Sequence, residues 1–131
     1  MKNRLFISCC GNKLDHAAPA IKLYQARQFK LAQQLLERGW EVTIISAKYG
    51  LVDAAQVIDT YDQKMTPKRS DEILCRAFRQ DISDTNNYVF GGELYRRIIR
   101  KMDPSVHELV GANRGNGDHY SAFANLAGEQ A

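Results

Sequence analysis

The chain of 131 residues has the length of one domain, and its 44% hydrophobic and 25% charged residues are typical of a globular protein. Its 18 basic and 15 acidic residues give a net charge of +3, an excess too small to establish a nucleic-acid partner. Three cysteines and the lack of an apolar run of roughly 20 residues argue against a disulfide scaffold and a membrane span, so we expect one cytoplasmic domain over residues 1–131.

The first half of the chain alternates between strand and helix patterns. Arg4–Cys9 is a short apolar run typical of a strand buried on both faces. Tyr24–Arg38 has helical spacing and ends before Gly39, a common stop signal. Val42–Ala47 is rich in β-branched residues and predicts a second buried strand. The residues expected to face the core from the helix are Phe29, Ala32, Leu35 and Leu36.

The middle of the chain begins with a turn at Lys48–Gly50. Leu51–Met65 has no clear period, and we interpret it as irregular. Thr66 before Pro67 is typical of a helix N-terminus. This helix is expected to reach Asp81, with Leu74, Ala77 and Phe78 facing inward.

The last third repeats the alternation. Asn86–Asn87 predicts a turn, and Tyr88–Phe90 predicts a short strand. Glu93–Met102 is the most regular helical pattern, and Val106–Val110 is a half-polar run typical of an edge strand. The chain closes with a glycine-rich loop, Gly111–Gly117, and a short helix, Tyr120–Leu126.

This order predicts an α/β fold: a single three-layer domain with a mainly parallel four-stranded sheet and helices on both faces. Such sheets bind ligands beyond the carboxyl ends of their strands. Four polar or glycine-rich segments follow the predicted strands and should converge there, namely Ser8–Lys13, Ser46–Gly50, Phe90–Gly92 and Gly111–His119.

The segment Ser8–Lys13 offers backbone N–H groups and a cation to an anion. It lacks the spacing of a P-loop and of a dinucleotide fingerprint, and the alternative is a strand exit with buried thiols. Cys9 or Cys10 would need a nearby base or cation to act as a nucleophile, whereas Cys75 is interpreted as helix packing. The cysteines and histidines do not have zinc-site spacing, and we predict neither a metal nor a cofactor.

The segment after the second strand carries Lys48 and Tyr49, with Asp59 and Asp62 downstream. A lysine holds phosphate and a tyrosine stacks on a base. A carboxylate activates water or stabilises a sugar cation. The alternative is a turn in which Tyr49 packs and both carboxylates are solvated or cap the chain.

Two further groups carry usable chemistry. Arg96, Arg97, Arg100 and Lys101 share one helical face that would contact phosphates, or would be an ordinary solvated face. The late loop contains Arg114, Asp118 and His119, and an exposed loop without function is the alternative.

Several motifs resemble a bacterial and phage family, domain of unknown function 6884. They are S-C-x3-K, L-Y-x4-F, S-A-K-Y-G-L followed by Y-D, and a G-x2-Y segment, over about residues 5–100. The matching positions are Ser8, Cys9, Lys13, Leu23, Tyr24, Phe29, Ser46–Leu51, Tyr61, Asp62 and Gly91–Arg97.

A second arrangement is similar to the YaaA family of peroxide-stress proteins. It comprises Tyr49–Leu51, Ile58, Tyr61 and Met65. A more distant resemblance reaches the archaeosine synthases and the α/β fold of uracil-DNA glycosylases. These resemblances imply work on nucleobases or nucleic acid. The chain lacks the helix-hairpin-helix signature of YaaA proteins and the sequence motifs of uracil glycosylases.

Together these features predict an enzyme that cleaves an N-glycosidic bond, or exchanges a base, in a nucleotide that is free or part of DNA. Lys13 and Lys48 would hold phosphate or sugar groups, and Tyr49 would stack on the base. The catalytic candidates are Asp59, Asp62 and Lys48. The ligand-binding candidates are Ser8, Cys9, Asn12, Lys13, Tyr24, Ser46, Tyr49, Gly50, Tyr61, Gly91, Arg114 and His119.

Two alternatives belong to other classes. One is a non-catalytic DNA-binding protein that uses the basic helix face. The other is a small phage-type protein that binds and blocks a host factor. A homodimer is compatible with each of these hypotheses.

Overall fold

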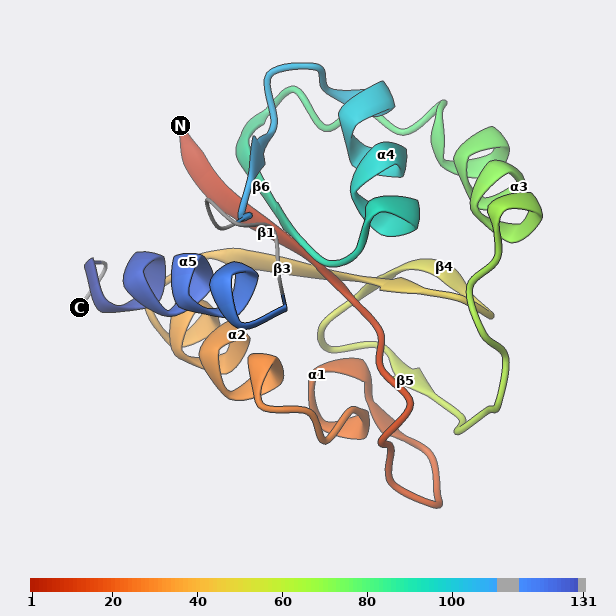
Figure 1. Ribbon diagram of the computed structural model, residues 1–131. Helices are drawn as coiled ribbons and strands as arrows, with labels where there is room; N and C mark the ends of the chain where they lie inside the picture. Colours follow the sequence, from red (N-terminus) through yellow and green to blue (C-terminus); the bar gives the residue numbers. More distant parts are fainter. Residues whose placement is uncertain (111–115, 130–131) are drawn as a thin grey trace.

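A computed structural model describes residues 1–110 and 116–129 (Figure 1). Its centre is a five-stranded sheet in the order β4-β3-β1-β6-β7. The strands are β1 (Lys2–Ser8), β3 (Glu41–Ser46), β4 (Gly50–Asp53), β6 (Thr85–Phe90) and β7 (His107–Glu108). The helices are α1 (Ala20–Leu23), α2 (Gln28–Glu37), α3 (Pro67–Ala77), α4 (Glu93–Met102) and α5 (Asn116–Glu129). A separate two-stranded sheet pairs β2 (Ala18–Pro19) with β5 (Val57–Ile58).

Helices cover both faces of the central sheet (Figure 1). Side chains alternate between the faces along each strand. Leu5 and Ile7 therefore belong to the core under α1, α2 and α5, whereas Phe6 belongs to the core under α3 and α4. The predicted α/β class and the two helical layers are confirmed. No helix within residues 1–110 and 116–129 has both the length and the apolar composition needed to cross a membrane.

The predicted four-stranded, mainly parallel sheet was wrong, because the sheet has five strands and is mixed. β4 runs antiparallel to β3, in the segment that we had interpreted as irregular. A tight turn reverses the chain between Ser46 and Gly50, which are paired in the hairpin. Gly50 has φ +81°, a left-handed conformation that glycine adopts without strain. The hydroxyl of Ser46 accepts the backbone N–H groups of Lys48 and Tyr49 and so stabilises this turn.

The predicted helix at 24–38 is replaced by two shorter helices. Tyr24 follows α1 in an extended conformation with ψ 133°, and it pairs with Lys13 in an isolated antiparallel bridge. This conformation lets the buried Tyr24 ring stack on Phe29 at the start of α2, with 4.9 Å between the ring centroids. Phe29, Ala32 and Leu35 are buried as predicted, but Leu36 is 39% exposed.

In the second half, α3 begins as predicted, and Thr66 accepts a hydrogen bond from the backbone N–H of Arg69 at 3.1 Å. The helix ends at Ala77, so Phe78 lies outside it and is 62% exposed rather than inward. The predicted turn at Asn86–Asn87 is wrong, because both residues lie within β6. The predicted bounds of α4 are confirmed.

The end of the chain differs from the predicted loop and short helix. α5 begins at Asn116, so residues 116–119 are helical. Residues 111–115 lie outside the described part of the chain.

The order of the strands creates a switch point beside β1. The chain leaves β1 toward α1 and α2 on one face, and it leaves β6 into α4 on the other face. The carboxyl ends of the two strands are very close there. A Cβ on Gly91 would lie 2.7 Å from Ser8 Cβ, and Gly91 has φ +153°. Ligands of open α/β sheets bind at such a point, because the diverging connections leave a crevice.

We expect Gly91→Ala to lower the free energy of unfolding by about 1 to 3 kcal/mol, because the new methyl group overlaps Ser8 and the backbone conformation is strained. Urea denaturation at constant pH measures this loss. Gly11→Ala is the matched control, since nothing lies within 4 Å of its added Cβ. Equal stability of the two variants would contradict the argued role of Gly91.

Candidate functional site

A cavity of about 250 Å³ lies at the carboxyl ends of the central strands. Its walls come from the exit of β1, from the segment before α3 and from the first turn of α4. The side chains that bear chemistry are Cys9, Cys10, Lys13, Asp62, Lys64 and Tyr95. This is the crevice that the switch point between β1 and β6 predicts.

Three of the predicted site residues line this cavity directly: Cys9, Lys13 and Asp62. Ser8 and Gly91 are buried side by side just before the connections diverge, so they shape the site without lining it. Asn12 contributes its backbone carbonyl, which accepts hydrogen bonds from the Cys10 thiol and the backbone N–H of Gln25. Asn12 therefore stabilises the loop that follows β1 and has no side-chain role in the cavity lining.

Three other predicted residues form a hydroxyl network beside the cavity. Ser46 Oγ donates to the Tyr61 hydroxyl at 2.8 Å, and the hydroxyls of Tyr61 and Tyr24 lie 2.7 Å apart. None of the three lines the cavity. The Lys13 ammonium lies over the ring of Tyr61, with Nζ 4.5 Å from the ring centroid, and so connects this network to the cavity wall.

The remaining residues of the second predicted constellation lie elsewhere. Tyr49 and Gly50 line a separate cavity of about 90 Å³ against α3. The backbone carbonyl of Asp59 accepts a hydrogen bond from the Tyr49 hydroxyl, and its carboxylate accepts one from the N–H of Thr60. Lys48 has its Nζ 5.3 Å from the Tyr49 ring centroid and is exposed. The lining of the candidate cavity therefore includes Asp62 and Lys13 but neither Asp59 nor Lys48.

Two ligand-binding candidates come from the late loop. Arg114 lies outside the described residues. The backbone of His119 belongs to α5, and its side chain lies outside the described part of the structure.

Tyr95 and Lys64 are site residues that the sequence analysis did not select. The sequence pattern places Tyr95 in the helix Glu93–Met102, and in the structure its hydroxyl lies 3.3 Å from Cys9 Sγ. Burial raises the pKa of Tyr95 well above its ordinary value, so its hydroxyl stays protonated at neutral pH. The G-x2-Y segment, which ends at this tyrosine, was the available signal. Lys64 had no signal except its position two residues after Asp62.

The three thiols have different environments. Cys9 Sγ accepts the backbone N–H of Ala47 at 3.4 Å and contacts Tyr95, so it is part of the packed wall. Burial raises the pKa of the Cys10 thiol, which disfavours a reactive thiolate at neutral pH. Cys75 lies in α3 but is exposed, which overturns the interpretation that it is a packing residue of its helix.

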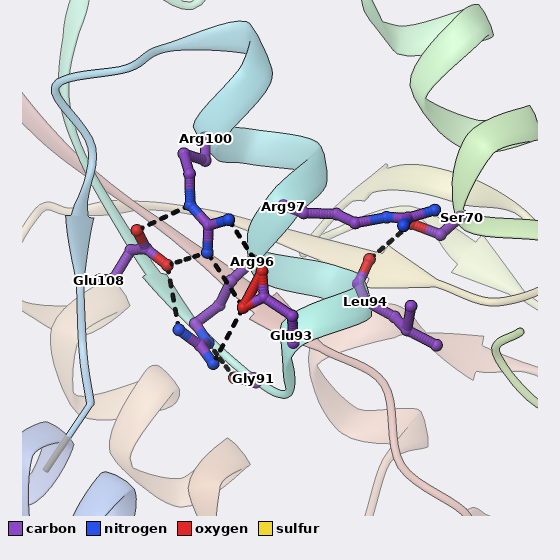
Figure 2. A network of polar contacts seen from close by, with 8 residues as sticks. All are labelled: Ser70, Gly91, Glu93, Leu94, Arg96, Arg97, Arg100 and Glu108. Atoms are coloured by element: carbon purple, nitrogen blue, oxygen red, sulfur yellow. Dashed lines mark hydrogen bonds and ion pairs between the residues drawn. The ribbon is translucent and has the colours of Figure 1, made fainter. Parts of the chain in front are cut away.

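The arginines of α4 are bound within the protein (Figure 2). Arg100 donates through Nε and Nη2 to both carboxylate oxygens of Glu108, at 2.9 and 2.7 Å, and it also binds Glu93. Arg96 donates to Glu108 at 3.1 Å and to the carbonyl of Gly91 at 2.9 Å. These bonds fasten α4 to β7 and to the end of β6.

Arg97 fastens the same helix to α3. It donates to Ser70 Oγ and to the carbonyl of Pro67, each at 2.9 Å, and to Asp71 at 2.6 Å. Ser70 in turn donates to the carbonyl of Leu94 (Figure 2). The three arginines therefore do not form the open cationic face considered from sequence, although Lys101 on this helix is exposed.

A comparison with protein families identifies the family of this chain. The family of unknown function DUF6884 matches residues 5–113. The chain belongs to this family. Comparisons with curated proteins and with solved structures gave no match. The matched range contains the strands and the loops that line the cavity, so the site belongs to the part of the chain that defines the family.

We expect Glu108→Gln to lower the free energy of unfolding by about 1 to 2 kcal/mol at pH 7, because it weakens the charge-assisted hydrogen bonds from Arg96 and Arg100, which are partly screened by solvent. Arg100 hydrogen bonds lower the pKa of Glu108, so this stabilisation is present above the unfolded pKa and is lost as the pH falls through the folded pKa. The difference between variant and wild type should therefore shrink toward about pH 3.

Urea denaturation at both pH values measures this effect. Glu72→Gln is the control, since Glu72 is half-exposed and its contact with Arg69 is 3.7 Å long. It should change stability by less than about 0.5 kcal/mol. A Glu108→Gln loss that does not depend on pH would contradict the ion-pair explanation.

Proposed function

We propose that the cavity binds a nucleotide and that the protein hydrolyses its N-glycosidic bond. The observation that carries this proposal is that Asp62 shares the cavity at the switch point with Lys13 and Lys64. Two ammonium groups against one carboxylate give the wall a net positive charge that suits an anionic ligand. The ion pairs of the described residues include none of these three side chains.

The size of the cavity favours a small ligand. Its volume of about 250 Å³ is near the lower end of the roughly 300–1,000 Å³ of small-molecule sites. This space suits one nucleotide unit better than a dinucleotide. A single nucleotide extruded from DNA would fit in the same way as a free one.

In the proposed reaction, Asp62 accepts a proton from a water molecule as the water oxygen bonds to the anomeric carbon of the sugar. The bond between that carbon and the base nitrogen breaks, and its electron pair stays with the base, which takes up a proton from solvent. Asp62 then releases the proton of the attacking water to solvent, so that one water molecule is consumed overall. The carboxylate also stabilises the positive charge that develops on the sugar. The Tyr95 hydroxyl, kept neutral by burial, also lines the cavity and would donate a hydrogen bond to the base.

The resemblance to YaaA proteins and to uracil-DNA glycosylases supports a base-directed reaction. The family shown by comparison carries no assigned function, so this relation stays a prediction. Of the original catalytic candidates, the proposal retains Asp62 alone. DNA binding by α4 is less favoured, because it would have to compete with the ion pairs of Arg96, Arg97 and Arg100.

We expect the purified protein to release a free base from nucleotides or DNA, detected by mass spectrometry. Asp62→Asn should lower the rate by about 10²- to 10⁴-fold, which is the usual contribution of a positioned general base. Asp59→Asn is the matched control, because this carboxylate does not line the cavity. It should retain the rate of the wild type.

The proposal fails if no base is released from any nucleotide or DNA pool. It also fails if Asp59→Asn and Asp62→Asn reduce the rate equally. Comparison of free nucleotides with single-stranded and double-stranded DNA identifies the form of the substrate.

A further inference from the structure

The ammonium of Lys13 is held over an aromatic ring at the cavity wall. A lysine side chain is long and flexible, so on most surfaces its charge is spread over many positions. Here Nζ lies 4.5 Å from the centroid of the Tyr61 ring, within the distance at which a cation is attracted to the ring face. Lys13 lines the cavity and Tyr61 does not. Tyr61 therefore lies behind the cavity wall and supports the lysine there.

Hydrogen bonds to its hydroxyl fix the Tyr61 ring in position. Ser46 is fully buried and accepts the N–H groups of Lys48 and Tyr49, so its own hydrogen is directed to the Tyr61 hydroxyl. The Tyr61 hydroxyl also lies 2.7 Å from that of Tyr24. These partners hold the tyrosine without any contribution from the ligand.

Two neighbouring rings restrict Tyr61 further. Tyr49 and Tyr24 both meet it edge-on, with centroid distances of 5.6 and 6.4 Å. Burial raises the pKa of Tyr24 to about 12 and that of Tyr61 still further, so both remain neutral phenols at physiological pH. The face of Tyr61 thus stays a fixed, uncharged platform for the cation.

We propose that Tyr61 is a positioning residue that holds the Lys13 ammonium at the cavity wall to bind a phosphate group, which makes the site one for phosphorylated ligands. This inference rests on the proposed function and names its substrate class as nucleoside monophosphates rather than nucleosides. Lys48 provides an internal comparison. It lies over Tyr49 in a similar way but does not line the cavity.

The test is calorimetric titration with adenosine and uridine 5′-monophosphates and with the two nucleosides. We expect the wild type to prefer the monophosphates and Lys13→Ala to lose this preference. Tyr61→Leu should weaken monophosphate binding by about 3- to 30-fold, which corresponds to the range of cation–π energies, and leave nucleoside binding unchanged. Tyr61→Phe keeps the ring but loses the hydrogen bonds that fix it, so its affinity should fall between those of the wild type and of Tyr61→Leu.

Two further variants separate positioning from general damage. The double variant Lys13→Ala/Tyr61→Leu should bind monophosphates no more weakly than Lys13→Ala, because the tyrosine acts through the lysine. Lys48→Ala should bind as the wild type does. Equal losses for Lys13→Ala and Lys48→Ala would overturn the inference.

A spectroscopic measurement needs no ligand. The ring current of Tyr61 should shift the ε-methylene protons of Lys13 upfield in the NMR spectra of the wild type and of Tyr61→Phe, but not of Tyr61→Leu. If Tyr61→Leu does not fold, phenylalanines with increasing numbers of fluorines at position 61 keep the shape of the ring and weaken its attraction for cations. Monophosphate affinity should then fall stepwise, and a flat series would overturn the inference.

The outcomes distinguish the two proposals. If the wild type releases no base from any nucleotide or DNA pool, the proposed function fails and this inference fails with it. If the wild type binds monophosphates and releases base while Tyr61→Leu binds them equally well, only the inference fails.

Discussion

The site depends on the close approach of two strand ends. β1 and β6 pair in parallel register from Lys2 and Thr85 to Ile7 and Phe90, and the next step brings Gly91 against Ser8. Only a residue without a Cβ fits there. Beyond this point the two connections leave for opposite faces of the sheet, and the space between them is the cavity. Cys9 Sγ and the Tyr95 hydroxyl lie 3.3 Å apart, so the two connections meet in the lining of this cavity.

The positive charges of the protein perform two different tasks. The guanidinium groups of α4 are planar and form paired hydrogen bonds with carboxylates, and their bonds to Glu108 and Asp71 fix the helix that carries Tyr95. The lysines at the cavity are compact cations that take no part in the ion pairs of the described residues. The arginines thus build the site and the lysines are available to a ligand. Net charge alone does not separate these tasks.

Elements with strong local signals were predictable from the sequence. The bounds of α4 followed from its regular helical pattern, and the start of α3 followed from the Thr66 cap. Asn87 shows why other elements were not. It favours turns by local propensity, yet in β6 it is buried and its amide binds the carbonyl of Ile82 and the carboxylate of Asp103. Such tertiary partners replace the local hydrogen bonds of a turn and are invisible in a single sequence.

The candidate site was predictable as a region but not residue by residue. The rule for strand ends identified Ser8–Lys13 and Ser46–Gly50, but it could not choose between Asp59 and Asp62. These two carboxylates are three residues apart in a segment without regular structure, and the path of that segment sends only Asp62 to the cavity. Tyr95 was missed for a related reason, because an amphipathic residue has the same pattern whether its hydroxyl faces solvent or a site.

Ser46 connects the folding of the sheet edge to the geometry of the site. The same oxygen accepts the two N–H groups of the turn that creates β4 and donates to Tyr61. A buried hydroxyl without hydrogen-bond partners would lower the stability of the fold. The Ser46 hydroxyl has partners in both roles, because it accepts from the turn and donates to Tyr61. Because the turn fixes Ser46, Ser46 fixes Tyr61, and Tyr61 carries Lys13, the antiparallel hairpin that the sequence pattern did not reveal is also what places a cation at the cavity.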